Sequence, residues 1–476
     1  MHIYLSGIGG TGLSPLAHLA LDCNYTVSGS DKEDSQNLKD LNGRGVNTSL
    51  VQSLEEIQLI HNQNPIDWII TTSALPETHP HKTFARVNNI RITKRHELIN
   101  HIIETKNLKL IAVAGTHGKT TTVGMMVWIL KQMQIPVSYL IGTNISFGRS
   151  GQFTLGSQYF VYECDEFDRN FLNFEPYLSI IPSLDYDHPD TYKTEKDYSE
   201  AFVQFMSQSK CVISWEVVNL YMQSVYTRQN LSFTKMLDGR EIYFLQDNET
   251  NNQEYYMTNQ WINLPGILNR RNALVAMSGL ASFCNMDMDQ MLKVVASFPG
   301  TQRRFEKLTT NLYSDYGHHP AEIFATLQLA NELVTSDYKS QIATFEGKLM
   351  EKAGGIHRQK IILVYQPHQN IRQHDPEIQA GYGHCFDNAY KVYWLPTYLS
   401  REYSHLPILT PQEIIDQSEL KTNSKNANVN FEIAEMNQKL VEQIKVHLLG
   451  GDIVIIMGAG DIDNWIRCNQ ELISKS

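Results

Sequence analysis

The chain has 476 residues, which is enough for about three domains at ~150 residues each. Its 40 Lys and Arg residues against 51 Asp and Glu give a net charge of −11, which argues against non-specific binding to nucleic acid or to a membrane surface. No apolar run approaches the ~18 residues of a membrane span, and the opening MHIYLSGIGG lacks the regions of a secretory signal. The six cysteines include no Cys-x-x-Cys pair, so we expect reduced thiols and a cytoplasmic protein.

Short apolar strands alternate with helical patterns through the first part of the chain. A strand at 2–7 is followed by a glycine-rich turn and a helix at 13–22, and more strands are expected at 25–31, 46–51, 67–73 and 90–93. Such alternation indicates a parallel sheet with crossover helices. The pattern restarts near 105–108, so we predict a first domain over 1–105.

The same alternation continues in two further blocks, predicted as domains over 106–308 and 309–476. The run LKLIAVAG at 108–115 is typical of a strand buried on both faces, and a helix is expected to follow it. The polar segment 245–260 is expected to be a surface hairpin or loop. The polar stretch from Thr335 to Arg358 is predicted to be irregular, as a local insertion. The predicted fold class is therefore α/β, with three parallel-sheet domains in series.

The sequence GIGGTG at residues 7–12 lies between a predicted strand and a predicted helix. Glycines at this spacing let backbone N–H groups approach a diphosphate at the start of a helix. Asp31 ends the second strand, where an acid that binds ribose is expected. The motif indicates a ligand that contains a diphosphate, without specifying a nicotinamide cofactor.

The sequence AGTHGKTT at 114–121 is the strongest single motif of the chain. A strand, a glycine loop with Gly-Lys-Thr and a helix together form a cradle for nucleotide phosphates. The motif departs from the strict P-loop pattern because Val113 replaces its first glycine. It predicts the use of ATP or GTP.

Two acidic runs, ECDEFD at 163–168 and DYDHPD at 185–190, follow apolar strands. The carboxyl ends of parallel strands are where ligands bind in open α/β sheets. Carboxylates with one imidazole suit Mg²⁺ or Mn²⁺ beside nucleotide phosphates.

Two groups of histidines are not interpreted as metal sites. His96, Glu97 and His101 have one residue too many for a zinc-binding His-Glu-x-x-His motif, so a helix surface is expected. The adjacent His318 and His319 are expected to contact a polar substrate.

In their order along essentially the whole chain, these segments resemble the Mur ligases. The matching segments are GIGGTG, AVAGTHGKTTT, YECDEFDRNFL, DYDHPDTY, LPGILNRRNAL, FPGTQRRFE, SDYGHHPAEI, YQPH and GAGDI. The resemblance is greatest to the branch that joins L-alanine to UDP-N-acetylmuramate. It implies a Rossmann-like N-terminal domain for the UDP-sugar, a central P-loop-type ATPase domain, and a Rossmann-like C-terminal domain for the amino acid.

The resemblance also implies the reaction. The lactyl carboxylate of UDP-N-acetylmuramate attacks the γ-phosphorus of ATP, and the amine of L-alanine then displaces phosphate from the acyl phosphate. Mg²⁺ or Mn²⁺ is the implied metal. Matched by motif, the ATP-binding residues are Gly115, Thr116, His117, Gly118, Lys119, Thr120, Thr121, Asn269, Arg304 and Asp315. The metal ligands are Thr120, Glu163 and His188, and the catalytic residues are Lys119, Glu163, His188, Arg304 and His318.

The same resemblance assigns residues to the other two substrates. Those for the UDP-sugar are Gly7, Gly9, Gly10, Thr11, Gly12, Asp31, Ser73 and His318. Those for the amino acid are Tyr316 and Arg372. Either His188 or His318 is the base that deprotonates the alanine ammonium. No nucleic-acid partner is implied, and no oligomeric state is indicated.

Two residues depart from the family pattern. Leu268 stands where the family has a histidine before its adenine-facing asparagine. Gln369 replaces the first of two arginines near the amino-acid carboxylate, while Arg372 keeps the second. A charge-assisted bidentate contact is thereby lost, which bears on the identity and affinity of the amino acid.

Three alternatives compete with this interpretation. A recycling ligase that joins a whole tripeptide to the same sugar nucleotide shares the first two glycine motifs, but KRHELI near Arg95 and the QPH segment favour the alanine branch. An NAD-dependent oxidoreductase would leave the Gly-Lys-Thr loop unexplained. A degenerate ligase is opposed by intact Lys119, Glu163, His188 and Arg304.

Overall fold

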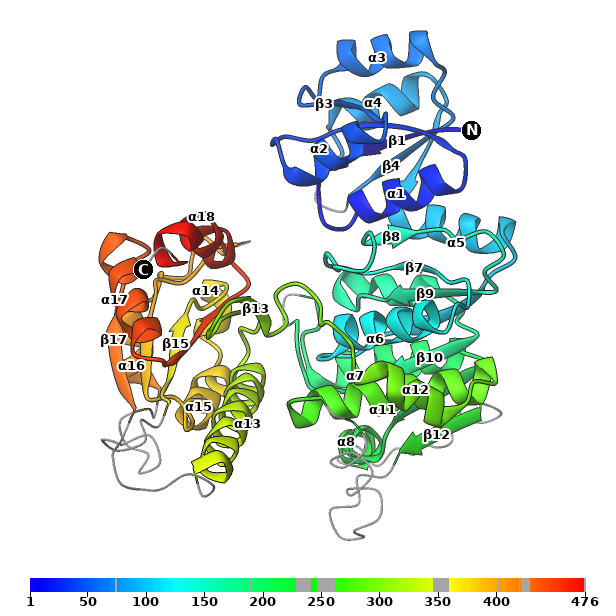
Figure 1. Ribbon diagram of the computed structural model, residues 1–476. Coiled ribbons are helices and arrows are strands. Elements are labelled where there is room, and N and C mark those ends of the chain that lie inside the picture. The colour runs from blue at the N-terminus through cyan, green and yellow to red at the C-terminus, as the bar shows by residue number, and fades with distance from the viewer. Residues whose placement is uncertain are drawn as a thin grey trace. The chain divides into compact units, whose positions relative to one another are not determined.

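The computed structural model describes residues 1–72, 75–188, 191–227, 241–245, 262, 264–345, 359–400, 402–418, 420 and 429–474. It confirms an α/β fold with three largely parallel sheets (Figure 1). The chain divides into two compact units, Met1–Asn263 with Arg271–Thr301, and Leu264–Arg270 with Gln302–Ser476. The first two sheets belong to the first unit and the third sheet to the second. The domain boundaries at 105 and 308 stay predictions.

The first sheet is five-stranded and parallel, in the order β3-β2-β1-β4-β5. Its elements are β1 (His2–Ser6), α1 (Ser14–Asp22), β2 (Thr26–Ser30), α2 (Gln36–Gly43), β3 (Asn47–Ser49), α3 (Leu54–Gln63), β4 (Trp68–Thr71), α4 (Pro80–Val87), β5 (Arg91–Lys94) and α5 (Arg95–Thr105). The strands predicted in this region are all present. His96 and His101 lie on α5, as expected for a helix, and the His101 ring packs against Trp68.

Over the described residues, the second sheet has seven strands in the order β12-β11-β10-β6-β9-β7-β8; the pair β7–β8 is antiparallel and the other pairs are parallel. Its elements are β6 (Lys109–Val113), α6 (Lys119–Gln132), β7 (Ser138–Leu140), β8 (Gly151–Gln152), β9 (Tyr159–Glu163), the 3₁₀ helix η1 (Phe167–Asn173), β10 (Leu178–Ile181), α7 (Glu195–Gln208), β11 (Cys211–Trp215), α8 (Glu216–Thr227), β12 (Glu241–Leu245), α11 (Ile267–Cys284) and α12 (Met288–Val295). Residues 246–260 of the predicted polar loop lie outside the described residues.

The third sheet has six strands in the order β13-β14-β18-β15-β16-β17, with β13 antiparallel. Its elements are β13 (Glu306–Thr309), β14 (Leu312–Asp315), α13 (Pro320–Phe345), β15 (Ile361–Tyr365), α14 (Asn370–Gln373), α15 (Pro376–Cys385), β16 (Lys391–Trp394), α16 (Pro411–Gln417), β17 (Asn430–Ile433), α17 (Gln438–Leu449), β18 (Ile453–Met457) and α18 (Ile462–Ser474).

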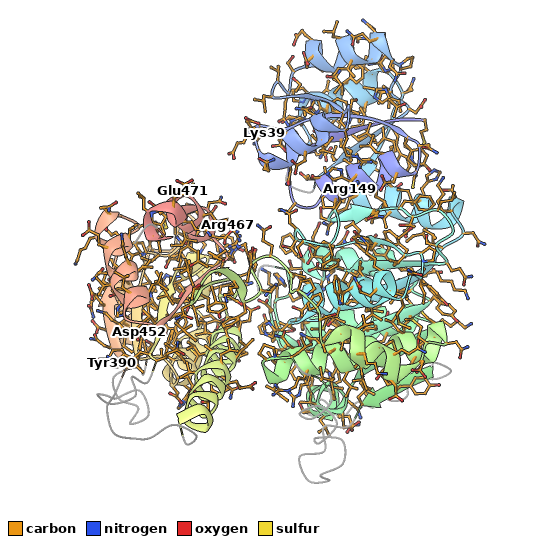
Figure 2. The ribbon with its side chains drawn as sticks, viewed as in Figure 1. Lys39, Arg149, Tyr390, Asp452, Arg467 and Glu471 are labelled. Carbon is orange, nitrogen blue, oxygen red and sulfur yellow. The ribbon has the colours of Figure 1, made fainter. Side chains whose placement is uncertain are left out.

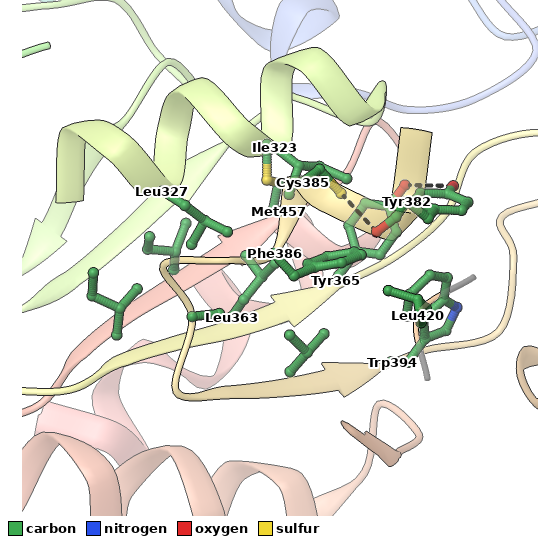
Figure 3. Packing of buried hydrophobic residues seen from close by; sticks show 14 of the residues in the cluster. Ile323, Leu327, Leu363, Tyr365, Tyr382, Cys385, Phe386, Trp394, Leu420 and Met457 are labelled. Carbon is green, nitrogen blue, oxygen red and sulfur yellow. Dashed lines mark hydrogen bonds between the residues drawn. The ribbon is translucent and has the colours of Figure 1, made fainter. Parts of the chain in front are cut away.

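Helices cover both faces of the third sheet, which explains its uniformly apolar central strands. Residues of α13 and α15 pack with Leu363 and Tyr365 of β15 on one face (Figure 3). Residues of α17 and α18 pack with Ile362 and Val364 on the other face. Alternate residues of one strand therefore enter two separate cores. On that second face, Arg467 of α18, labelled in Figure 2, pairs with Glu306.

The prediction of an irregular segment from Thr335 onward is wrong for its first part. Helix α13 continues through these polar residues to Phe345. A helix already formed by an apolar first half adds one hydrogen bond per further residue, so elongation needs no apolar stripe. Residues 346–358 lie outside the described part of the chain.

Two further features bear on the sequence expectations. All six cysteines are free thiols: Cys23, Cys164, Cys211 and Cys385 are buried, Cys284 is intermediate, and Cys468 is exposed. Among the helices of the described residues, none combines the length and the apolar character needed to cross a membrane.

Candidate functional site

The phosphate-type loop joins β6 to α6 at the carboxyl edge of the second sheet. Gly115 and Gly118 have φ angles of +137° and +83°, which disfavour any residue with a side chain. A Cβ added at Gly115 would lie 2.5 Å from the Ser183 carbonyl oxygen, and one added at Gly118 would lie 2.5 Å from Oδ1 of Asn272. Helix α6 then begins at Lys119 without a side-chain cap. The loop thus has the backbone conformation and the close packing that its glycines predict.

Lys119 makes three contacts through its ammonium group. Nζ donates to the carbonyl oxygens of Gly115 (2.5 Å) and Thr116 (3.2 Å) and to Oε1 of Glu166 (2.8 Å). Burial lowers the pKa of Lys119, but the adjacent Glu166 carboxylate outweighs it, so the net shift is upward. Burial would raise the pKa of Glu166, yet Lys119 and His188 hold it below its usual range. Both groups are therefore charged at neutral pH.

Thr120 and Glu163 are brought together beside this lysine. The Thr120 hydroxyl donates to Oε1 of Glu163 at 2.6 Å, and the Gly142 backbone N–H donates to Oε2 at 2.7 Å. A hydroxyl and a carboxylate are hard oxygen ligands of the kind that Mg²⁺ prefers, so this pair fits the predicted metal.

His188 lies near two other acids, Glu166 and Asp187. Its Nε2 lies 3.4 Å from Oε1 of Glu166 and 3.8 Å from Oδ2 of Asp187, and its backbone has a φ of +58°. Within the described ranges, no group of three or more His, Cys, Asp or Glu residues is arranged to hold a metal ion. The role of His188 as a metal ligand stays a prediction.

The remaining loop residues contact the segment after β10. The Thr116 hydroxyl donates to the Asp185 carbonyl oxygen at 2.6 Å and lies 2.9 Å from the Tyr198 hydroxyl. The His117 N–H donates to the Ser183 hydroxyl at 2.8 Å. Thr121 is buried in the first turn of α6. The two motifs that the sequence predicts at one sheet edge therefore do meet there.

The first glycine loop joins β1 to α1. Gly7 has a φ of +94°, and α1 begins without a side-chain cap. The Asp31 carboxylate accepts the backbone N–H groups of Gly9 at 2.8 Å and Lys32 at 2.7 Å, so it organises the loop itself. Gly10 and Thr11 are exposed, as a ligand-binding turn requires.

Arg95 is a cation at this loop to which the sequence analysis gave no role. A Cβ added at Gly12 would lie 2.9 Å from an Arg95 guanidinium nitrogen, and Arg95 pairs with Asp165 at 3.4 Å. The signal was present in KRHELI, but nothing in the spacing connects it to a glycine loop about 80 residues earlier, since only the fold makes them neighbours. Ser73 lies outside the described residues.

In the second unit, the start of α11 is held by Glu332. Its carboxylate accepts Arg270 at 3.0 and 3.2 Å and the Gly266 N–H at 3.0 Å. Asn269, predicted to face adenine, donates to the Pro265 carbonyl oxygen at 2.9 Å. Leu268, the departure from the family pattern, is 40% exposed and so replaces no core contact.

Arg304 and Asp315 lie close together in this unit. Burial raises the pKa of Asp315 to about 6, against the opposing effect of Arg304. The Asp315 carboxylate also accepts the N–H groups of Phe305 (2.8 Å) and Gly317 (2.7 Å). Nη1 of Arg304 lies 3.6 Å from Oε1 of Glu322, and its Cζ lies 5.3 Å from the centre of the Tyr316 ring.

Glu322 is a second residue that the sequence analysis missed. It accepts the backbone N–H groups of His318 at 2.9 Å and His319 at 3.2 Å, and it pairs with Arg304. The His318 ring lies 5.1 Å from the His368 ring. One partly buried acid therefore positions several residues that the sequence predicts separately.

Gln369 and Arg372 are linked directly. The buried Arg372 donates from Nε to Oε1 of Gln369 at 3.1 Å. Gln369 has a φ of +59°, which is strained for a residue with a side chain, and its N–H donates to the Tyr398 carbonyl oxygen at 2.9 Å. The residue that departs from the family pattern thus supports the arginine that is kept.

A pocket of about 630 Å³ lies at the opposite edge of the second sheet. Lys109 and Lys210 line it, with ammonium groups 4.8 and 5.0 Å from the centre of the Tyr177 ring. These residues precede or begin their strands, whereas the phosphate-type loop follows β6, so this pocket is not the predicted nucleotide site.

Comparison with known proteins identifies the family. The family model described as "Mur ligase family, catalytic domain" matches residues 2–107, and "Mur ligase middle domain" matches residues 113–279. This chain belongs to the Mur ligase family. The match includes both glycine loops and the acidic strand ends, which confirms the resemblance inferred from the motifs.

Individual Mur ligases match over nearly the whole chain. The UDP-N-acetylmuramate–L-alanine ligase of Caldicellulosiruptor saccharolyticus is 28% identical, over 99% of this chain and 98% of its own length. The structure of the UDP-N-acetylmuramate–alanine ligase from Thermotoga maritima is similar with a TM-score of 0.71 at 23% identity, covering 99% of both chains. A murein peptide ligase from Psychrobacter arcticus is similar with a TM-score of 0.61 at 20% identity, covering 100% of this chain and 99% of its own. The two structures establish the fold over the full length.

Proposed function

We propose that this Mur ligase uses ATP to join L-alanine to the lactyl carboxylate of UDP-N-acetylmuramate, giving UDP-N-acetylmuramoyl-L-alanine, ADP and phosphate for peptidoglycan synthesis. The observation that carries the proposal is the Lys119 loop with the Thr120–Glu163 pair beside it, which is suited to a nucleotide with a divalent cation. The near full-length similarity to an alanine-adding ligase supports the choice of substrates.

The chain contributes positioning and positive charge to the phosphoryl transfer. The backbone N–H groups of the loop and the Lys119 ammonium hold the phosphates, and Arg304 adds a second cation as the carboxylate attacks. Thr120 and Glu163 would hold Mg²⁺ or Mn²⁺, which when bound neutralises charge on the reacting anions. The glycine loop at residues 7–12 holds the diphosphate of the sugar nucleotide. Asp31, which accepts the Gly9 N–H and so shapes that loop, is assigned to the ribose.

The second step requires a neutral amine near the activated carbonyl. Arg372 binds the carboxylate of the amino acid and is oriented for this by Gln369. His188 and His318 both remain candidates for the base, since each has an acidic residue near its ring: Glu166 at 3.4 Å and Glu322 at 3.8 Å.

The test is phosphate release with ATP, Mg²⁺ and UDP-N-acetylmuramate, comparing L-alanine, L-serine, glycine and a tripeptide as acceptors. Release that depends on L-alanine and is abolished by Lys119→Ala would support the proposal. The matched control is Glu175→Gln, at the opposite edge of the same sheet, which should keep wild-type activity.

Two outcomes would point elsewhere. Turnover only with the tripeptide would assign the chain to the recycling branch, to which the similar murein peptide ligase draws attention. Absence of phosphate release with every acceptor, from protein shown to be folded, would support a degenerate ligase.

The proposed compartment is the cytoplasm, because six free thiols suit a reducing environment.

A further inference from the structure

Glu166 is the most deeply buried acid near the phosphate-type loop. Its side chain is 1% exposed, whereas the Lys119 side chain it contacts is 16% exposed. Its backbone carbonyl oxygen accepts the Tyr192 hydroxyl at 2.6 Å, which fixes this part of the chain. Oxygen Oε1 receives Lys119 and lies 3.4 Å from Nε2 of His188, while Oε2 is buried without a hydrogen-bond partner. Burying a carboxylate in this way costs desolvation free energy unless a nearby positive charge compensates for it.

The contacts of Lys119 show what that charge does. An ammonium group has three N–H donors, and here all three are accepted by Gly115, Thr116 and Glu166. Glu166 supplies the only full negative charge among these acceptors. Glu166 is therefore already paired with the Lys119 ammonium, and a nucleotide phosphate that binds Lys119 must displace or share that pairing.

We propose that Glu166 is a positioning residue that holds Lys119 and His188 in place and, by competing with phosphate for Lys119, makes nucleotide binding depend on a divalent cation. The proposal rests on the proposed function, in which the loop binds ATP. A nucleotide arriving without metal brings several negative charges toward a buried carboxylate, which opposes binding. A divalent cation beside Thr120 and Glu163 offsets that repulsion.

The sign of this effect separates it from a purely structural role. Glu166→Gln keeps the size of the side chain and an acceptor for Lys119 but removes the negative charge. It should tighten binding of metal-free ADP by about tenfold, which corresponds to about 1.4 kcal/mol, because the repulsion between the Glu166 carboxylate and the phosphates is removed. It should also lower kcat, because Lys119 and His188 lose the carboxylate that orients them.

The experiment measures the Kd of ADP by calorimetry, in EDTA and in Mg²⁺, for the full chain. Glu166→Gln should lower the Kd of ADP measured in EDTA. The ratio of the Kd in EDTA to the Kd in Mg²⁺ should therefore be smaller than in the wild type. Glu166→Asp retains the charge and should leave that ratio near its wild-type value while lowering kcat. Glu175→Gln removes an exposed charge from the other edge of the sheet and should leave Kd and kcat unchanged.

The results distinguish failure of this inference from failure of the proposed function. If folded Glu166→Gln binds metal-free ADP as the wild type does, or more weakly, the competition is refuted. If Glu166→Asp tightens metal-free binding as much as Glu166→Gln does, charge is not the cause and the inference is also refuted. If wild-type protein does not bind ADP in Mg²⁺, or Lys119→Ala does not weaken that binding, the assignment of the loop itself is wrong.

Discussion

Removing Lys119 should destabilise the first unit as well as abolish activity. Glu166 is 1% exposed on its side chain, and Lys119 is its closest cation at 2.8 Å, so Lys119→Ala leaves a buried carboxylate with His188 as its remaining partner. Breaking a buried ion pair from one side costs roughly 3–5 kcal/mol. Because Lys119 keeps some solvent contact, we expect about 3 kcal/mol, near the lower end of that range.

The double variant Lys119→Ala/Glu166→Gln tests whether the unpaired charge causes this loss. It removes both charges, so it should be more stable than Lys119→Ala alone by about 2 kcal/mol. Urea unfolding of the full chain at neutral pH, with a thermodynamic cycle over the four proteins, measures the coupling. A coupling energy below about 0.5 kcal/mol would refute the reasoning. The effects of mutations at distant, independent sites already depart from additivity by that much.

The pH dependence provides a second check on the same variants. In the wild type the pKa of Glu166 is lowered in the folded state, so its stabilising contribution is present above the usual carboxyl range and is lost as pH falls through the folded value. Without Lys119, burial dominates and raises that pKa. Lys119→Ala should therefore gain stability relative to the wild type as the pH is lowered from 7 toward 5.

Three further predictions concern other sites. Glu163→Gln removes the charge that faces Thr120 and should raise the Mg²⁺ concentration for half-maximal phosphate release by about 10–100-fold, with a smaller change in the KM of UDP-N-acetylmuramate. Arg372→Lys loses the planar donor fork and should raise the KM of L-alanine by about tenfold or more, whereas an unchanged KM would remove Arg372 from the acceptor site. Burial lowers the pKa of His81 to about 4, so acid should destabilise the first sheet by up to ~3 kcal/mol between pH 6.5 and 4, and His81→Gln should flatten that dependence in urea unfolding.

The local patterns predict the sheets and loops well because they depend on neighbouring residues. The apolar run before Gly115 and the Gly-Lys-Thr after it specify a buried strand, a turn with positive φ and a helix start. Nothing comparable distinguishes Glu166 from the other acids of ECDEFD, because its importance arises from burial and from contact with a residue 47 positions earlier. The same limit applies to Glu322 of α13, which contacts Arg304 of the QRRF motif and His318 of the HH pair only once the chain is folded.

The helix α13 shows the opposite limitation. Its second half is polar, and polar composition was interpreted as loop, although the residues continue a helix that is already formed. The strained backbone of Gln369 also leaves no mark in the sequence, because glutamine rarely adopts a positive φ and no pattern predicts it.

The difference in exposure among the six thiols should allow one cysteine to be labelled selectively. Cys468 on α18 is the one exposed thiol of six, and burial raises the pKa of Cys284 to about 11 and that of Cys23 to about 12. Since the thiolate is the reactive form, maleimide reagents at neutral pH should modify Cys468 first by a wide margin. A fluorophore attached there, without any engineered cysteine, would report on the second unit during turnover, and α18 carries none of the residues proposed to bind substrate.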